Sequence, residues 1–197
     1  QGYPSKPIRV IVGYTAGGAV DIVARAVSQQ LQTSLGQPII VENRPGAGTN
    51  IALRALIDSP ADGYTLMLTA NAIAANMSLY QPAPYDLARD ITPISLVGRV
   101  PVVLAVNAQS EYKTLGDLIA AARAKPGELA FASGGPGSSL HIAIEVLKRA
   151  ANISVTYVPF GGTAPAVNAL MGNHVAAVWA DYPTVVSQLK AGTLRGL

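Results

Sequence analysis

The stretch Ile8-Arg9-Val10-Ile11-Val12-Gly13-Tyr14-Thr15-Ala16-Gly17-Gly18 decides the fold, because a strand pattern passes through a glycine-rich turn into a helix. Residues 8–12 are rich in β-branched side chains and predict a buried strand. From Ala19 to about Ser34 the apolar side chains recur with helical spacing. The apolar positions expected on one face of that helix are Ile22, Val23, Ala26, Val27 and Leu31. A strand, a glycine turn and a helix in this order are typical of α/β proteins.

The same alternation continues to the end of the chain. Gly36 and Pro38 separate the first helix from a second buried strand expected at 39–41. Further strands are expected at 64–69, 100–106, 129–133, 155–158, 175–180 and from 194, and helices at 51–58, 114–124, 139–151, 163–171 and 183–190. Short strands that alternate with helices favour mostly parallel sheets, covered on both faces and joined by right-handed crossovers.

The composition predicts a chain that buries most of itself. Apolar residues make up 50% of the 197 positions and charged residues 13%, whereas about 25% charged residues is usual. Mean hydropathy is +0.33. The apolar runs are about five to eight residues long, well short of the ~18 that span a bilayer, so no membrane insertion is expected.

Charge and residue usage exclude several partners. The net charge is +3, but the basic residues are scattered and little interleaved with aromatic ones, so no nucleic-acid partner is expected. The chain has no cysteine and two histidines, His141 and His174, so neither a metal nor a cofactor is expected. Its opening, Gln1-Gly2-Tyr3-Pro4, suits a terminus from which a signal peptide has been removed, or a trimmed one.

Two glycine-rich turns that lead into helices are the main candidates for binding an anion. A helix start presents unsatisfied N–H groups and the positive end of the helix dipole, and glycine lets a ligand approach the backbone. The candidates in the first turn are Tyr14, Ala16, Gly17, Gly18 and Asp21. Those in the second are Ser133, Gly134, Gly137, Ser138, Ser139 and His141.

The uncharged candidates each have a structural alternative. Glycines 17 and 18 also suit an ordinary tight turn, and Ser138 or Ser139 a simple helix N-cap. Tyr14 fits the wall of a pocket and a half-buried loop position equally well. The residues alone leave these alternatives open.

The charged candidates allow two interpretations each. Asp21 either supports the helix start, with Arg25 as its i,i+4 partner, or pairs with the ammonium group of a ligand. His141 shares the polar face of its helix with Glu145 and Lys148, which favours a solvent-facing imidazole unless the first turn faces the ligand.

Polar residues also follow the other strands, where open α/β sheets bind their ligands. These candidates are Thr69, Asn71, Gly161, Thr163 and Asp181. Alternation along residues 175–181 places Trp179 on the same side as Asp181, with core packing as the favoured role for the indole.

A serine hydrolase is the enzymatic alternative, because Ser138, His141 and Asp181 supply the residue types of a triad. The stretch Gly137-Ser138-Ser139-Leu140 lacks the second glycine of a nucleophile elbow, so no catalysis is expected. Nucleotide binding is not expected either, since residues 134–139 lack the lysine of a phosphate-binding loop.

Six stretches carry a resemblance that spans essentially the whole chain. They are residues 6–21, Val41-Glu42-Asn43-Arg44-Pro45-Gly46-Ala47-Gly48, Asp62-Gly63-Tyr64-Thr65-Leu66, residues 132–141, Tyr157-Val158-Pro159-Phe160-Gly161-Gly162 and Lys190-Ala191-Gly192-Thr193-Leu194-Arg195. Together they resemble the Bug-type periplasmic receptors of tripartite tricarboxylate transporters.

The resemblance implies a two-lobed clamshell of the type II periplasmic-binding-protein kind, with a mostly parallel sheet flanked by helices in each lobe. Residues 1–101 would form lobe one and residues 102–197 lobe two. The return of the chain to lobe one would follow Leu197, so lobe one is expected to be incomplete and to expose apolar surface.

The resemblance also implies a function. A small carboxylate, such as an amino acid, a di- or tricarboxylate or an aromatic acid, would be held between the lobes by backbone amides of the two glycine-rich turns, assisted by waters. The protein would be a monomeric periplasmic receptor that closes around its ligand and serves a membrane transporter or sensor. The alternative of the same fold is the effector module of a transcriptional regulator, although nothing before the first strand leaves room for a DNA-binding helix pair.

Overall fold

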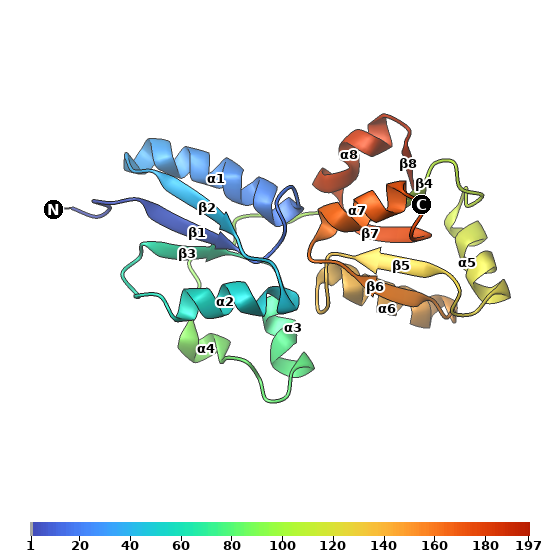
Figure 1. Cartoon of the computed structure of the whole chain (residues 1–197), viewed down its shortest axis with the longest axis horizontal. Coiled ribbons are helices and arrows are strands. Elements are labelled where there is room, and N and C mark those ends of the chain that lie inside the picture. Colours follow the sequence, from blue (N-terminus) through green and yellow to red (C-terminus); the bar gives the residue numbers. More distant parts are fainter. Residues whose placement is uncertain (1) are drawn as a thin grey trace. The chain divides into compact units, whose positions relative to one another are not determined.

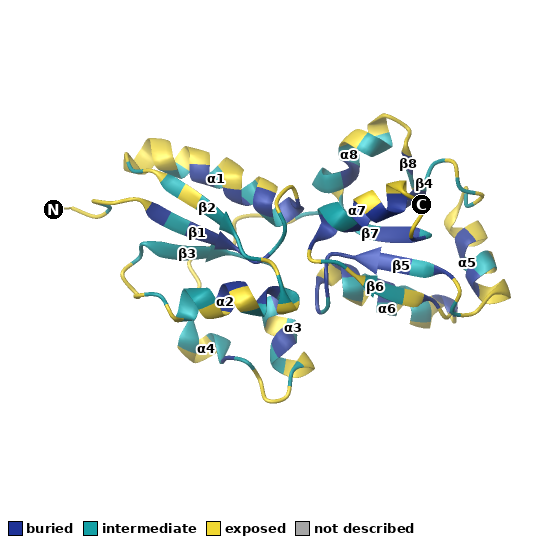
Figure 2. Cartoon of the chain, viewed as in Figure 1, coloured by how far each residue is buried: buried dark blue, intermediate teal, exposed yellow. Residues whose placement is uncertain are grey.

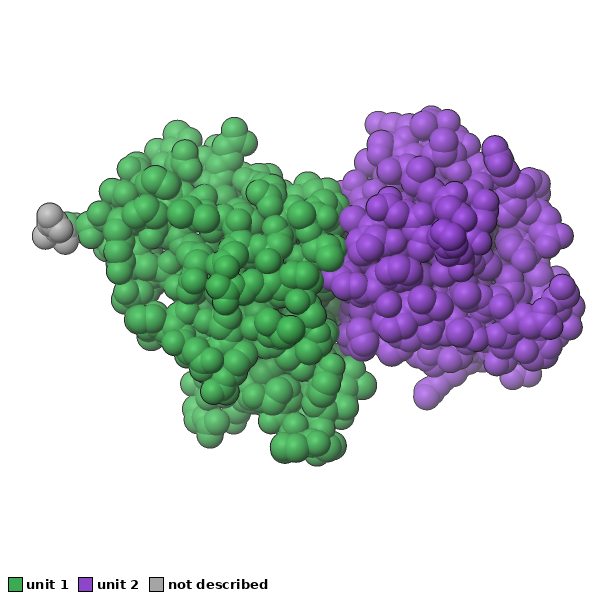
Figure 3. Space-filling model, viewed as in Figure 1, with its two compact units in different colours: residues 1–97 green, residues 98–197 purple. Residues whose placement is uncertain are grey.

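The computed structural model describes residues 2–197, so Gln1 lies outside the described residues. The chain divides into two compact units, one ending at Val97 and the other running from Gly98 to Leu197 (Figure 3). Each unit is built from alternating strands and helices around its own sheet (Figure 1).

The first unit has a three-stranded parallel sheet in the order β2-β1-β3. Its elements are β1 (Ile8–Val12), α1 (Ala19–Leu35), β2 (Ile39–Asn43), the 3-10 turn η1 (Ala47–Thr49), α2 (Asn50–Ile57), β3 (Thr65–Leu68), α3 (Ala72–Leu79) and α4 (Leu87–Asp90). The short helices α3 and α4 follow β3, in a stretch for which the sequence predicted no helix. The central strand β1 is the most buried, as its β-branched pattern predicted.

The face that the first helix, α1, buries agrees only in part with the one that its apolar pattern predicted: Val23, Val27 and Leu31 are half-buried, whereas Ala26 is exposed. Its fully buried positions are Ala19, Asp21, Ala24 and Ser28, whereas Ile22 is 41% exposed. The hydrogen bonds of Asp21, described below, draw that side chain inward and fix the rotation of the helix. The helix ends as expected at Gly36, whose left-handed conformation (φ 66°) lets its N–H donate to the Gln32 carbonyl.

The expected exposed apolar surface is present in the first unit. Strand β2 was predicted to be buried, but Ile40 is 55% exposed, and every residue of β3 is only half-buried (Figure 2). Side chains of a strand point to both faces of its sheet, and here the covering elements bury few of them fully. Further apolar side chains exposed in this unit are Leu35, Ile51, Leu79, Ile94, Leu96 and Val97.

The second unit has a five-stranded sheet in the order β6-β5-β7-β4-β8. Its elements are β4 (Val102–Asn107), α5 (Leu115–Ala124), β5 (Ala130–Ser133), α6 (Ser139–Ala151), β6 (Thr156–Pro159), α7 (Thr163–Met171), β7 (Ala177–Asp181), α8 (Tyr182–Lys190) and β8 (Leu194–Gly196). Strand β5 pairs in parallel with β6 and β7, whereas β4 is antiparallel to β7 and β8. The sheet is therefore mixed: four of its strands run in the same direction, in partial agreement with the expected mostly parallel sheet, and β4 is reversed.

Helices cover both faces of this second sheet. On one face Leu104, Phe131 and Ala177 pack with α5 and α6, and on the other their strand neighbours Ala105, Ala132 and Val178 pack with α7 and α8. Most residues of β5 and β7 are accordingly buried (Figure 2). Two-sided burial explains the short, unbroken apolar runs in the sequence.

Candidate functional site

The turn after β1 leads into a helix start that no side chain caps. Gly17 occupies a positive φ (78°), and Gly18 is the extended N-cap residue of α1, with no side chain to accept a hydrogen bond from the first-turn amides. Ala16 and Gly17 are exposed. The first N–H groups of a helix have no intrahelical acceptor, so this turn offers donors and a positive dipole end to an anion.

Asp21 holds that turn in place from within the protein. The residue is 2% exposed, and its carboxylate accepts hydrogen bonds from the Gly17 N–H (2.9 Å), the Arg25 Nε (3.0 Å) and the Asn43 Nδ2 (2.9 Å). Burial by itself would raise the pKa of Asp21, but the hydrogen bonds from Arg25, Gly17 and Asn43 hold it below its usual value. Of its two interpretations, support of the helix start is the one that these contacts favour.

Asn43 is a contributor to this turn that the sequence analysis did not single out. Its Nδ2 also donates to the Tyr14 carbonyl (3.0 Å), and its Oδ1 accepts from Arg25 Nη2 (3.0 Å). Asn43 is the last residue of β2, the parallel neighbour of β1. The rule that carboxyl ends of parallel strands meet at one edge would have pointed to it.

Three more expected residues lie in the first unit. Tyr14 is half-buried in the turn. Thr69, after β3, is also half-buried, and its hydroxyl lies 3.5 Å from the adjacent Ala70 carbonyl. Asn71 is exposed and starts α3 through its carbonyl, which accepts from the Ala74 N–H at 3.0 Å, rather than through its side chain.

The turn after β5 in the second unit is capped by its own side chains. The Ser138 hydroxyl donates to the Gly135 carbonyl (2.7 Å) and accepts from the His141 N–H (3.2 Å), which makes Ser138 the N-cap of α6. The Gly137 N–H donates to His141 Nδ1 (3.2 Å). Ser139 is exposed. Simple capping, the alternative raised for Ser138, accounts for both of its hydrogen bonds.

His141 faces the sheet rather than the solvent. Its side chain is 23% exposed and stacks on the Tyr157 ring, with centroids 4.1 Å apart and planes 13° from parallel. The Tyr157 hydroxyl is 3.0 Å from the Ser133 Oγ, so the ring also ties β6 to the end of β5. Tyr157 was not singled out from the sequence, since only the pairing of the two strands brings it to this turn.

The turns after β6 and β7 meet the turn after β5. Thr163 is buried, and its hydroxyl donates to the Asp181 carboxylate (2.8 Å). A Cβ placed on Gly134 would lie 3.1 Å from the Thr163 amide nitrogen, so glycine permits this close approach. Burial raises the pKa of the Asp181 carboxyl, and the Thr163 hydrogen bond lowers it in part. Gly161 is exposed, and neither α7 nor α8 has a side-chain cap.

These contacts do not form a hydrolytic triad. The Ser138 proton is directed to a carbonyl, the His141 Nδ1 is occupied by the Gly137 amide, and Asp181 is bonded to Thr163. A triad requires the serine hydroxyl to donate to an imidazole that a carboxylate orients in turn.

A concave surface of about 640 Å³ lies elsewhere in the first unit. It is lined by Arg44, Asn50, Ile51, Arg54, Ala55, Asp58, Pro84 and Tyr85. Its two arginines pair with carboxylates of Glu42 and Asp58, and none of the expected site residues lines it.

Trp179 is half-buried and packs against the core of the second unit.

Membrane spans and metal clusters were also sought over residues 2–197. Within that range no helix is both long and apolar enough to cross a bilayer. No three His, Asp or Glu side chains of those residues gather where they would hold a metal ion.

Residues 23–197 match the family described as "Tripartite tricarboxylate transporter family receptor". Protein BugT of Bordetella pertussis is 41% identical over 197 residues, a match that covers 99% of this chain and 60% of BugT. An R. palustris protein solved with adipate has a TM-score of 0.95 at 33% identity, covering 100% of this chain and 66% of that one. The periplasmic binding protein BugD has a TM-score of 0.93 at 27% identity, covering 98% and 65%.

The fold is therefore that of a periplasmic binding protein, built here from two α/β units. More narrowly, the chain belongs to the receptor family of tripartite tricarboxylate transporters, and the resemblance inferred from the sequence is confirmed. The chain spans less than two thirds of the length of BugT.

Proposed function

We propose that the whole protein is a periplasmic receptor that captures a small carboxylate and presents it to a membrane transporter or sensor. The two units, which divide between Val97 and Gly98, would be its two lobes, and the receptor would act as a monomer. It would bind its ligand without chemical change, since each residue of the hydrolase alternative is engaged elsewhere.

The observation that carries the proposal is the uncapped start of α1. A serine, threonine, aspartate or asparagine often caps a helix start, as Thr114 caps α5 and Ser138 caps α6, whereas α1, like α2, α3, α7 and α8, has no side-chain cap. The start of α1 differs in following an exposed glycine turn at Ala16 and Gly17. Gly18 provides no acceptor, so the first-turn amides are left for an external one. A carboxylate fits this position by charge and by hydrogen bonding.

The second unit would supply further donors at the carboxyl ends of β5, β6 and β7. In that unit Ser139 and Gly161 are exposed, and the start of α7 at the buried Thr163 has no side-chain cap. The adipate named for the solved R. palustris relative supports a dicarboxylate as the ligand class. Amino acids and aromatic acids also carry the carboxylate that these amides would bind.

A thermal-shift screen of the full-length receptor tests this proposal. The panel contains glutamate, malate, adipate and benzoate. Each acid is paired with its amide, the compound in which every carboxyl group is replaced by a carboxamide. A ligand that binds only the native state raises the unfolding temperature, by an amount equivalent to about 2.7 kcal/mol at a hundredfold excess over Kd. We expect at least one acid to stabilise the protein while its amide does not. Equal shifts from acid and amide throughout the panel would exclude a carboxylate receptor.

A further inference from the structure

The two glycine-rich turns share one arrangement of hydrogen bonds. In each, a side chain on the first turn of the helix accepts a hydrogen bond from the amide of a glycine four residues earlier. In the first unit the Gly17 N–H donates to Asp21, and in the second the Gly137 N–H donates to His141 Nδ1. Both acceptors are largely shielded from solvent. The turns are therefore held without a ligand, which lowers the entropy that binding must overcome.

The two acceptors differ in one chemical respect. A carboxylate accepts hydrogen bonds throughout the physiological pH range, but Nδ1 of histidine accepts only when the ring is neutral and its proton is on Nε2. The surroundings of His141 suit that tautomer, because Nε2 faces the Glu145 carboxylate, whose Oε1 is 4.0 Å away. The stacked Tyr157 ring holds the plane of the imidazole.

We infer that His141 is a positioning residue: as the neutral Nε2–H tautomer it holds the Gly137 amide and thereby fixes the turn at residues 134–138 for ligand capture. The inference deepens the proposed function and rests on it for the role of the turn. It assigns His141 to the support of the site rather than to contact with the ligand. Protonation turns Nδ1 into a donor that opposes the Gly137 N–H, so it releases the turn.

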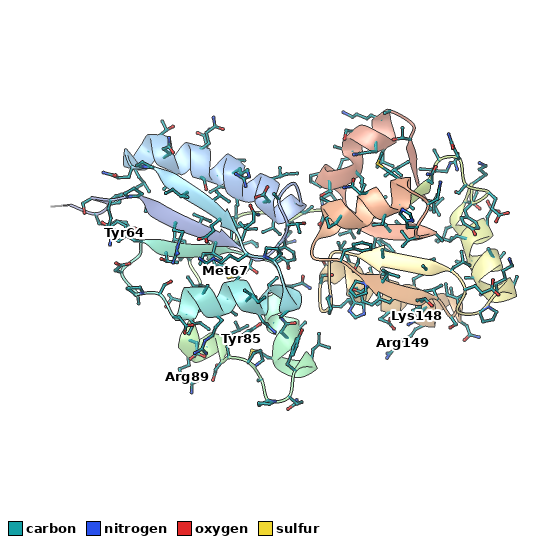
Figure 4. All side chains as sticks on the ribbon, in the orientation of Figure 1. Tyr64, Met67, Tyr85, Arg89, Lys148 and Arg149 are labelled. Carbon is teal, nitrogen blue, oxygen red and sulfur yellow. The ribbon has the colours of Figure 1, made fainter. Side chains whose placement is uncertain are left out.

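Capture should consequently weaken as the pH falls. Burial lowers the pKa of His141 below its usual value of 6.5, the charge of Glu145 opposes this shift, and that of Lys148 adds to it. Lys148, one of the side chains labelled in Figure 4, donates to both carboxylate oxygens of Glu145 (2.8 and 3.0 Å). This contact offsets the attraction of the Glu145 carboxylate for an imidazolium. Tyr157, the other titratable group against the ring, has its pKa raised mainly by burial and stays neutral. Affinity should therefore be constant from pH 7 to 8 and fall below pH 6.5.

Nuclear magnetic resonance of the full-length receptor, with ¹⁵N-labelled histidine and backbone, tests the inference without any ligand. We expect Nδ1 of His141 to show the shift of an unprotonated nitrogen at pH 7.5, and the Gly137 amide to titrate together with that ring, with a pKa below the usual histidine value of 6.5. An Nδ1–H tautomer, or a Gly137 amide that ignores His141, would overturn the inference even if ligand binding is normal.

Two variants separate positioning from simple packing. In His141→Asn the amide oxygen replaces Nδ1 as an acceptor but does not titrate, whereas His141→Ala removes the acceptor; His174→Asn on the exposed second histidine is the control. The probe is the strongest binder among glutamate, malate and adipate. At pH 7.5 we expect His141→Ala to bind about tenfold more weakly, in line with one lost hydrogen bond in a fixed turn, and His141→Asn to stay within about threefold of the wild type.

As the pH is lowered below 6.5, binding by the wild type and by His174→Asn should weaken more than binding by His141→Asn, because protonation of the ligand's own carboxyl groups affects all three proteins alike. The positioning role would be overturned if His141→Asn and His141→Ala lost equal affinity for the ligand. It would also be overturned if the affinity of His141→Asn depended on pH as that of the wild type does. If none of the probes binds the wild-type protein, the proposed function fails for that panel. The inference about His141 is then tested by its tautomer alone, which the resonance experiment measures without a ligand.

Discussion

Gly18→Asp should abolish most ligand binding while leaving the fold intact. The backbone of Gly18 is extended (φ −76°), and a Cβ there would meet only the Thr15 carbonyl oxygen at 3.4 Å, an ordinary contact. An aspartate side chain at this N-cap position would accept hydrogen bonds from the first-turn amides of α1 and take the place of the ligand carboxylate. We expect a loss of ~2 to 3 kcal/mol of binding free energy, about 30- to 150-fold in Kd.

Stability should move in the opposite direction, because an aspartate N-cap stabilises a helix by a few tenths of a kcal/mol relative to glycine. Gly18→Ala is the matched control, since it adds the Cβ without an acceptor and should keep affinity within about threefold. Calorimetry gives the affinity and thermal unfolding the stability of each variant. If Gly18→Asp binds the ligand with wild-type affinity, the start of α1 is not part of the binding site.

Phe131→Ala should cause the largest loss of stability in the second unit. Phe131 lies on β5, is 1% exposed and packs between the sheet and the helices α5 and α6. Truncation of a fully buried phenylalanine removes its apolar contacts and leaves a cavity, at a cost of about 3 to 5 kcal/mol. Chemical denaturation followed by the fluorescence of Trp179, which lies in the same unit, measures this loss.

Val146→Ala provides the comparison for Phe131→Ala. Val146 lies on α6 but is 59% exposed, so its truncation should change the free energy of unfolding by no more than about 0.5 kcal/mol. If Phe131→Ala costs less than about 1 kcal/mol, the core of the second unit is not organised around β5 as described.

Much of the fold could be predicted because its determinants are local. The strand at Ile8–Val12, the helix ending at Gly36 and the capping box of Thr114 and Asp117 depend on residues close together in the sequence, and all three are confirmed. The reversed direction of β4 could not be predicted, because it depends on which strands become its neighbours. The inward face of α1 was predicted only in part for a similar reason, since the hydrogen bond that Asp21 accepts from Asn43 of β2 helps to set it.

The candidate site was likewise predictable only where its determinants are close together in the sequence. The two glycine-rich turns were identified from their sequence, because the glycines and the helix start are contiguous. Whether a given amide is free depends on contacts that spacing does not reveal: the Gly17 and Gly137 amides are already bonded to Asp21 and His141. The partnership of Thr163 with Asp181 likewise arises only when β6 and β7 end at one edge of the sheet.

Calorimetric titration of the full-length receptor, refolded from denaturant to remove any co-purified ligand, tests the central claim most directly. The titrant is the acid that gives the largest thermal shift, with its amide as the matched neutral compound. The account predicts one acid bound per protein molecule, no detectable binding of the amide, and loss of the acid's binding in Gly18→Asp. Binding of the amide as tightly as the acid, or full affinity in Gly18→Asp, would contradict it.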